Sequence, residues 1–123
     1  MSDPCPFCES TQPPVFANEQ GYVMPDKHPV GPGHMLIIPH RHTASYFDLE
    51  PAERDGLFDL VDKARALLDT QHRPDGYNIG VNVGEVAGQT VMHVHIHLIP
   101  RFAGDTPHPR GGVRGVIPDR QSY

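Results

Sequence analysis

The chain has 123 residues, of which 37% are hydrophobic and 20% are charged, and its formal net charge is -5 with neutral histidines. This length is typical of a single domain that buries its own core. An acidic balance excludes a basic nucleic-acid groove as the main binding surface, although a small phosphate ligand needs only a few local donors. The sequence has no apolar run of about 18 residues and no apolar leader. We therefore expect a cytoplasmic protein that binds neither nucleic acid nor membrane.

The first third of the chain predicts three short strands. Apolar residues at 15–17 and 22–24 flank a Glu-Gln-Gly turn, which is the pattern of a β-hairpin. Residues 26–33 are rich in proline and glycine and predict a loop. Residues 34–38 predict a strand that ends at Pro39, because the residue before a proline favours extended backbone.

One long helix is predicted to begin near Glu50 or Pro51. Asp48 is a candidate N-cap, and proline is tolerated in a first turn, where its missing N–H costs nothing. The helical pattern ends before His72, and Gly56 is a weak position inside it. Apolar residues recur on one broad stripe, formed by Leu57, Leu60, Val61, Ala64, Leu67 and Leu68.

Two more strands are predicted at 77–83 and 89–99, and the short loop between them favours antiparallel pairing. The whole pattern predicts an α+β fold, in which one long helix packs on an antiparallel sheet of about five strands. We expect the domain to span residues 1–105. Residues 106–123, rich in glycine, proline and arginine, predict an extended tail that packs through its apolar island at 113–117.

Three histidines alternate with aliphatic residues near the end of the strand predicted at 89–99. Successive side chains of a strand point to opposite faces, so His93, His95 and His97 are predicted to line one face. A solvent face is usually filled with other polar residues, so this row indicates chemistry. One interpretation is a catalytic metal held by all three rings. Neighbours two apart on a strand lie about 6.5–7 Å apart, which is workable for two ligands and awkward for three.

The two cysteines form a Cys-Pro-Phe-Cys motif at Cys5 and Cys8. In a chain without a secretion signal, such a pair is typical of metal binding or redox chemistry. Redox motifs of this type follow a strand, whereas this pair precedes every predicted strand. Zinc is favoured, provided that two more ligands come from elsewhere. The alternative is a reduced thiol pair without a ligand.

The sequence HVHIHLI at 93–99 resembles the His-x-His-x-His-x-x signature of the histidine triad (HIT) family. The similarity extends to PVGPGHMLIIP at 29–39 and AGQTVMHVHIHLIPRFAGD at 87–105, and covers residues 5–105. It is greatest to the branch that hydrolyses dinucleoside polyphosphates. The resemblance implies reaction at the α-phosphorus of a small nucleotide substrate, and a homodimer joined through the long helix and a neighbouring strand.

The resemblance also implies roles for the residues near the reacting phosphate. His95 is implied as the nucleophile that forms a covalent nucleotidyl-histidine, which water cleaves to release a nucleoside monophosphate. His97 is implied to orient the phosphate oxygens. Gln89 and Thr90 are implied to contact the bridging and leaving oxygens.

Four further residues are implied to bind the substrate. Asp26 occupies the position that holds the ribose hydroxyls, and Asn82 and Gly88 lie on the phosphate side. His34 either supports the histidine cluster or is a satisfied core histidine. A second function stays open, namely a nucleotide sensor or interaction protein with vestigial turnover.

The cysteine pair departs from the dinucleoside hydrolase branch and resembles bacterial members of the family and the related galactose-1-phosphate uridylyltransferases. The implied zinc ligands are Cys5, Cys8, His42 and His93. Two thiolates and two imidazoles form a closed tetrahedral set, so the zinc is expected to be structural. His40 is the competing ligand to His42.

The tail carries one further hypothesis. Arg110 and Arg114 flank a Gly-Gly-Val segment and are proposed to fold back onto the distal phosphates of a long substrate, because an acidic protein needs local positive charge there. The alternative is a solvated tail.

Overall fold

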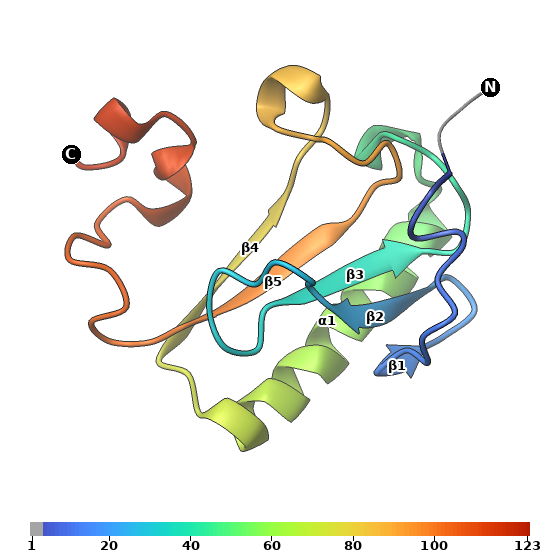
Figure 1. Ribbon diagram of the computed structural model, residues 1–123, viewed down its shortest axis with the longest axis horizontal. Coiled ribbons are helices and arrows are strands. Elements are labelled where there is room, and N and C mark those ends of the chain that lie inside the picture. The colour runs from blue at the N-terminus through green and yellow to red at the C-terminus, as the bar shows by residue number, and fades with distance from the viewer. Residues whose placement is uncertain (1–3) are drawn as a thin grey trace.

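The computed structural model describes residues 4–123 and contains a five-stranded antiparallel sheet with one long helix across one face (Figure 1). The strand order is β1-β2-β3-β5-β4. The strands are β1 (Phe16–Ala17), β2 (Gly21–Pro25), β3 (Met35–Pro39), β4 (Gly76–Val81) and β5 (Ile96–Arg101). The helix is α1 (Pro51–His72). The predicted α+β fold class is confirmed.

The main core lies between the sheet and α1, and this leaves the other sheet face for a site. Ile96 and Leu98 of β5 are buried against the helix. Because side chains alternate along a strand, the intervening His97 points to the opposite face. The predicted helical stripe supplies the other side of the core, through Leu57, Leu60, Val61, Ala64 and Leu68.

The histidine-bearing strand begins later than predicted. It starts at Ile96, so of the three histidines only His97 lies in β5. The cause is competition for backbone partners. The Val94 N–H donates to the Thr43 carbonyl (2.8 Å), and the carbonyl of Pro39 accepts from the His93 ring (2.8 Å). The segment before β5 therefore does not pair with β3, and the strand is shorter at this end than predicted. The predicted alternation still holds, because Val94 is buried in the same core cluster as Ile96 and Leu98, while one ring, that of Phe7, packs against both His93 and His95.

The N-terminus of α1 is capped by Glu50, and the expectation that Asp48 caps it is wrong. Asp48 belongs to a short 3-10 turn, Tyr46–Asp48, that precedes the helix. Glu50 and Glu53 form a reciprocal capping box. The largely buried Glu53 carboxylate also accepts from the guanidinium of Arg41 (2.8 Å). None of the helices within residues 4–123 has the length and apolarity of a membrane span.

Glu53→Gln is expected to lower the free energy of unfolding by about 1–3 kcal/mol, because it leaves Arg41 without its carboxylate partner. Hydrogen bonds from Arg41 lower the pKa of Glu53 below its ordinary value of 4.5. The contribution of the carboxylate to the free energy of unfolding is therefore complete above pH 4.5 and is lost as the pH falls through the lowered pKa. Urea titrations at pH 7 and pH 3 measure both effects. Asp55→Asn, on the exposed side of the same turn, is the control. An equal loss in both variants would contradict the prediction.

Gly56 has a packing reason inside α1. The turn before β2 crosses the helix at this point, where the Asn18 side-chain amide donates to the Gly56 carbonyl (2.9 Å). A Cβ at Gly56 would lie 2.4 Å from Cγ of Gln20. The glycine that weakens the helix locally thus allows the hairpin to approach it.

The C-terminal tail folds on itself instead of packing through its apolar island. Val113, Val116 and Ile117 are 61%, 76% and 59% exposed, so that expectation is wrong. The tail contains two 3-10 turns, Gly112–Val116 and Pro118–Arg120. Short-range hydrogen bonds organise it, such as those from Arg114 to the carbonyls of Gln121 and Arg120. The turn Gly112–Val116 contacts β4, where Gly112 lies beside Asn78.

Candidate functional site

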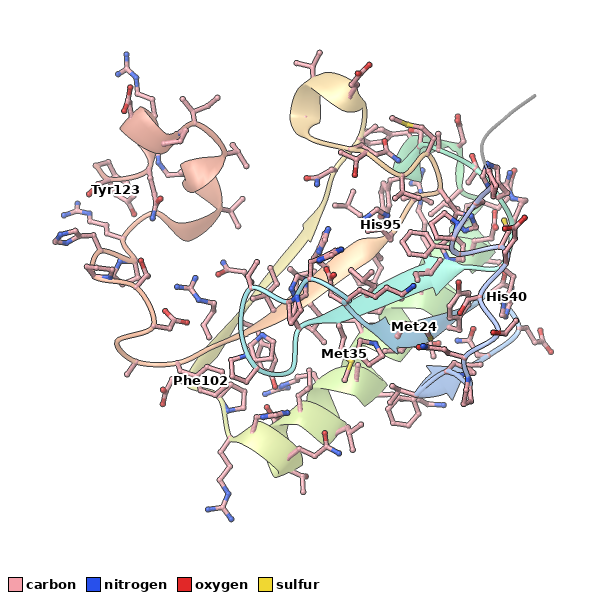
Figure 2. All side chains as sticks on the ribbon, viewed as in Figure 1. Met24, Met35, His40, His95, Phe102 and Tyr123 are labelled. Atoms are coloured by element: carbon pink, nitrogen blue, oxygen red, sulfur yellow. The ribbon has the colours of Figure 1, made fainter. Side chains whose placement is uncertain are left out.

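A cavity of about 730 Å³ opens on the sheet face opposite α1. The N-terminal segment, β2 with the loop after it, and the segment before β5 form its walls. Figure 2 shows His95 above the sheet, close to the N-terminal segment. Seven of the predicted site residues line this cavity, namely Asp26, Asn82, Gly88, Gln89, Thr90, His95 and His97.

The ring of His95 is oriented by the backbone. Its Nδ1 lies 3.0 Å from the carbonyl oxygen of His93. A carbonyl only accepts, so Nδ1 carries the proton and Nε2 keeps its lone pair. The ring lines the cavity. This tautomer is the one that a nucleophilic imidazole requires.

His34 fixes the tautomer of His97. The Val30 N–H donates to His34 Nδ1 (3.1 Å), so the His34 proton resides on Nε2. That Nε2 lies 2.9 Å from His97 Nδ1, which accepts. His97 therefore carries its proton on Nε2. The structure thus places His34, 4% exposed, beneath the cavity as a fully bonded histidine in contact with the histidine cluster.

Asp26 lies beside both of these rings. Its Oδ2 is 3.3 Å from His34 Nε2 and 3.8 Å from His97 Nδ1. Burial lowers the pKa of His34, against an opposing effect of Asp26. Burial, followed by the neighbouring His95 and His34, lowers the pKa of His97. Both rings are therefore neutral at pH 7, so His34 can donate to His97 and His97 keeps its proton on Nε2.

Gln89 is buried and its side chain is committed to backbone groups. Its Nε2 donates to the carbonyls of Ala44 (2.8 Å) and Val91 (3.1 Å), and its Oε1 accepts from the Gly84 N–H (2.9 Å). These bonds fix the segment before β5. Gly88 has φ +101°, a conformation that favours glycine.

The metal-ligand prediction corresponds to a compact donor cluster of Cys5, Cys8, His42 and His93. Cys8 Sγ lies 3.3 Å from His42 Nδ1, and Cys5 Sγ lies 3.4 Å from His93 Nδ1. The two Nδ1 atoms are 3.1 Å apart. A tetrahedral zinc with Zn–S of about 2.3 Å and Zn–N of about 2.0 Å separates S from N by about 3.5 Å and N from N by about 3.3 Å. The four donors therefore fit a zinc ion.

The second shell of this cluster is also suited to a metal. His93 donates its Nε2 proton to the Pro39 carbonyl, so its Nδ1 lone pair faces the other three donors. His40 lies outside the cluster, where its Nε2 bonds to the Asn18 carbonyl and its ring stacks on Tyr22. The geometry selects His42 over His40. It also contradicts one metal shared by the three neighbouring histidines, because His93 faces the cysteines.

Phe7 and Tyr22 are cavity residues that the sequence patterns did not single out. The Phe7 ring packs edge-on against His93 and His95, with centroids 5.7 and 5.1 Å apart. The Tyr22 hydroxyl donates to the Phe7 carbonyl (2.6 Å), and burial raises the Tyr22 pKa to about 12. The one sequence feature that could have indicated Phe7 as a site residue is its position between the two cysteines. The metal cluster and the cavity thus share a wall.

The tail arginines do not enter this cavity, whose lining within the described residues comes from positions 6–97. The guanidinium carbons of Arg110 and Arg114 lie 4.6 and 5.2 Å from the centre of the Tyr123 ring. Arg114 also donates to the carbonyl of Arg120 (2.9 Å). This arrangement does not bring either guanidinium into the cavity, and their contact with the distal phosphates of a long substrate stays a prediction.

The HIT domain family model matches residues 9–104, which include the histidines that line the cavity. The chain belongs to the HIT family. It is 31% identical over 105 residues to an AP-4-A phosphorylase of Mycobacterium tuberculosis, covering 77% of this chain and 54% of that protein. It is 43% identical over 77 residues to the asymmetrical bis(5'-nucleosyl)-tetraphosphatase of Schizosaccharomyces pombe, covering 63% and 42%.

A solved HIT structure carries the metal that the donor set fits. The chain resembles a zinc-bound histidine triad family protein from Mycobacterium smegmatis, with TM-score 0.74 and 32% identity over 85% of this chain and 79% of that one. This HIT chain spans about half the length of the two named enzymes.

Proposed function

We propose that this HIT protein transfers a nucleotidyl group to His95 and then to water. His95 Nε2 forms a bond to the α-phosphorus while the bond from that phosphorus to the bridging oxygen, or phosphoramidate nitrogen, breaks and its electron pair leaves with the departing group. Water adds to the same phosphorus, the N–P bond breaks toward Nε2, and a nucleoside monophosphate is released. The observation that carries this proposal is the His95 Nδ1–H bond to the His93 carbonyl, which frees Nε2.

The residues around His95 are proposed to bind the reacting phosphate. His97, with its Nε2 proton fixed by His34, donates to a phosphate oxygen, and Thr90 contacts the leaving oxygen. Asn82 and Gly88 line the phosphate side, and Asp26 accepts from the ribose hydroxyls. Gln89 is proposed as a positioning residue, since backbone groups occupy its amide.

Dinucleoside polyphosphates are the proposed substrate class. The names of the M. tuberculosis and S. pombe relatives support this choice. Nucleoside phosphoramidates present the same α-phosphorus with a smaller leaving group. Phosphate in place of water at the second step gives phosphorolysis by the same intermediate.

Zinc is proposed as a structural cofactor bound by Cys5, Cys8, His42 and His93. The tetrahedral spacing of these donors and the zinc-bound mycobacterial relative support it. The closed ligand set leaves no open position, so the ion stabilises the N-terminal wall of the cavity. Zinc ligation requires both cysteines in their reduced form, which supports the proposal of a reducing, cytoplasmic location.

A homodimer is proposed through α1 and β4. β4 is an edge strand, Ile79 on it is 47% exposed, and Phe58 on α1 is 41% exposed. A second copy would cover both side chains. Sedimentation equilibrium measures the mass of the assembly, and a monomer at micromolar concentration would contradict this.

Intact-protein mass spectrometry tests the reaction. After brief mixing with diadenosine tetraphosphate, the protein is expected to gain the mass of one adenylyl group, which disappears as AMP accumulates. The same adduct is expected from adenosine phosphoramidate. AMP binding without adduct or AMP release from either substrate would favour the nucleotide-sensor alternative.

A further inference from the structure

The sheet face that carries the histidines continues beyond His97. In the antiparallel pair β4–β5, His97 lies opposite Gly80 and Ile99 lies opposite Asn78. Directly opposed residues of such a pair point to the same face. Side chains from these positions therefore form a surface that extends from the reacting histidines toward Phe102, which Figure 2 places at the far end of the sheet from His95.

A second cavity of about 350 Å³ lies on that surface. Its lining combines apolar side chains with amide, hydroxyl and guanidinium groups and with the carboxylate of Asp105, which is paired with Arg101. The other residues that matter here are Val30, Pro32, Asn78, Ile99 and Phe102. Nothing in the chemistry at His95 uses this cavity. Its apolar surfaces suit a planar ring, as ligand sites generally do.

Gly80 leaves the surface between the two cavities open. Apart from its chain neighbours Ile79 and Val81, a methyl group at Gly80 would meet no atom of residues 4–123 within 4 Å. Because Gly80 faces the same side as His97, a ligand chain leaving the His97 side finds no side chain in its way. In the middle of a strand a glycine is otherwise unfavourable, which fits a position where a ligand passes close to the backbone.

Asn78 presents hydrogen-bond donors at the second cavity. Arg101 Nη1 donates to Asn78 Oδ1 (2.6 Å), which fixes the amide. Within residues 4–123 the Nδ2 group makes no hydrogen bond, although Gly112 of the tail lies beside it. Two hydrogen bonds of 2.7 Å to Asp105 hold the Arg101 guanidinium in place. The donor is therefore preorganised before any ligand arrives.

We propose that this second cavity binds the distal nucleoside of a dinucleoside polyphosphate, with the polyphosphate chain crossing over Gly80. The proposal rests on the proposed reaction at His95. From Asn82 to Asn78 the strand advances by four residues, about 13 Å, so an extended chain of several phosphates covers this distance. The leaving group of a phosphoramidate ends beside His97. The second cavity therefore selects dinucleoside polyphosphates over nucleotides with small leaving groups.

Gly80→Val tests the path, because a β-branched side chain suits a strand and obstructs the surface. The ratio of kcat/KM for diadenosine tetraphosphate to kcat/KM for adenosine phosphoramidate is expected to fall about ten-fold. Ile79→Val, which lies opposite Leu98 and so faces the other side of the same strand, is expected to leave the ratio unchanged. Asn78→Leu, which removes the hydrogen-bond donor, is also expected to lower this ratio.

Binding to His95→Ala protein provides a readout without turnover. Adding Gly80→Val to it is expected to raise the Kd of diadenosine tetraphosphate about ten-fold more than the Kd of AMP. An unchanged ratio in both Gly80→Val and Asn78→Leu, or an equal change in Ile79→Val, would overturn the proposal for the second cavity. Wild-type protein that binds diadenosine tetraphosphate but releases no AMP would overturn the proposed reaction at His95 and leave the proposal for the second cavity standing. Binding of neither ligand would overturn both.

Discussion

His95→Ala is expected to lower kcat for AMP release from diadenosine tetraphosphate by about 10⁴-fold, because the variant lacks the atom that forms the covalent intermediate. The neighbouring donors remain, so AMP still binds. The ring lines a cavity and does not belong to the main core, so the fold is expected to persist. Chromatographic assay of AMP and intact-mass detection of the adduct provide the two measurements.

His108→Ala, at an exposed position in the tail, is the matched control and is expected to keep wild-type activity. If His95→Ala retains activity within ten-fold of the wild type, the nucleophile is another group. Loss of AMP binding in the variant would point instead to collapse of the cavity.

His42→Ala is expected to abolish stoichiometric zinc binding and to lower the unfolding midpoint by about 10 °C. The variant leaves two thiolates and one imidazole, so the tetrahedral set is incomplete. The lost stability comes from the free energy of metal binding, which the folded state alone gains. Elemental analysis and thermal unfolding of the purified protein measure these two effects.

His40→Ala is the matched control, because His40 lies two residues away and makes a backbone bond outside the donor cluster. It is expected to retain one zinc per chain. Zinc loss in His40→Ala and retention in His42→Ala would reverse the assignment. Zinc retained by both variants would contradict the four-ligand site.

Zinc loss is also expected to weaken nucleotide binding while the sheet and α1 remain folded. Cys5 and Cys8 bracket Phe7, whose ring packs against His95 and whose segment lines the cavity. Without the ion, the Tyr22 bond to the Phe7 carbonyl is a remaining tether for that wall. Far-ultraviolet circular dichroism of His42→Ala would separate this local effect from general unfolding.

Local patterns predicted most of the architecture. The stripe from Leu57 to Leu68 predicted the helix and its buried face, and alternation predicted the strands. Predictions failed where a tertiary contact overrode a local preference. The histidine segment joins the sheet only at Ile96, because the Pro39 carbonyl bonds to the His93 ring and the Val94 N–H bonds to the Thr43 carbonyl. The capping box at Glu50 prevails over Asp48 because Glu53 binds both the Glu50 backbone and Arg41.

The sequence by itself determined which reactive groups are available, because residue identity and short spacing are local. These groups are a row of histidines and a pair of cysteines. The tertiary structure decided which of these groups lie at the donor cluster of the cysteines and which lie at the cavity. His93 turns toward the cysteines, while His95 and His97 turn toward the cavity. The choice of His42 over His40 and the tautomers set by His34 depend on groups far apart in the chain. Only folding brings such groups within hydrogen-bond distance, so sequence spacing alone does not predict them.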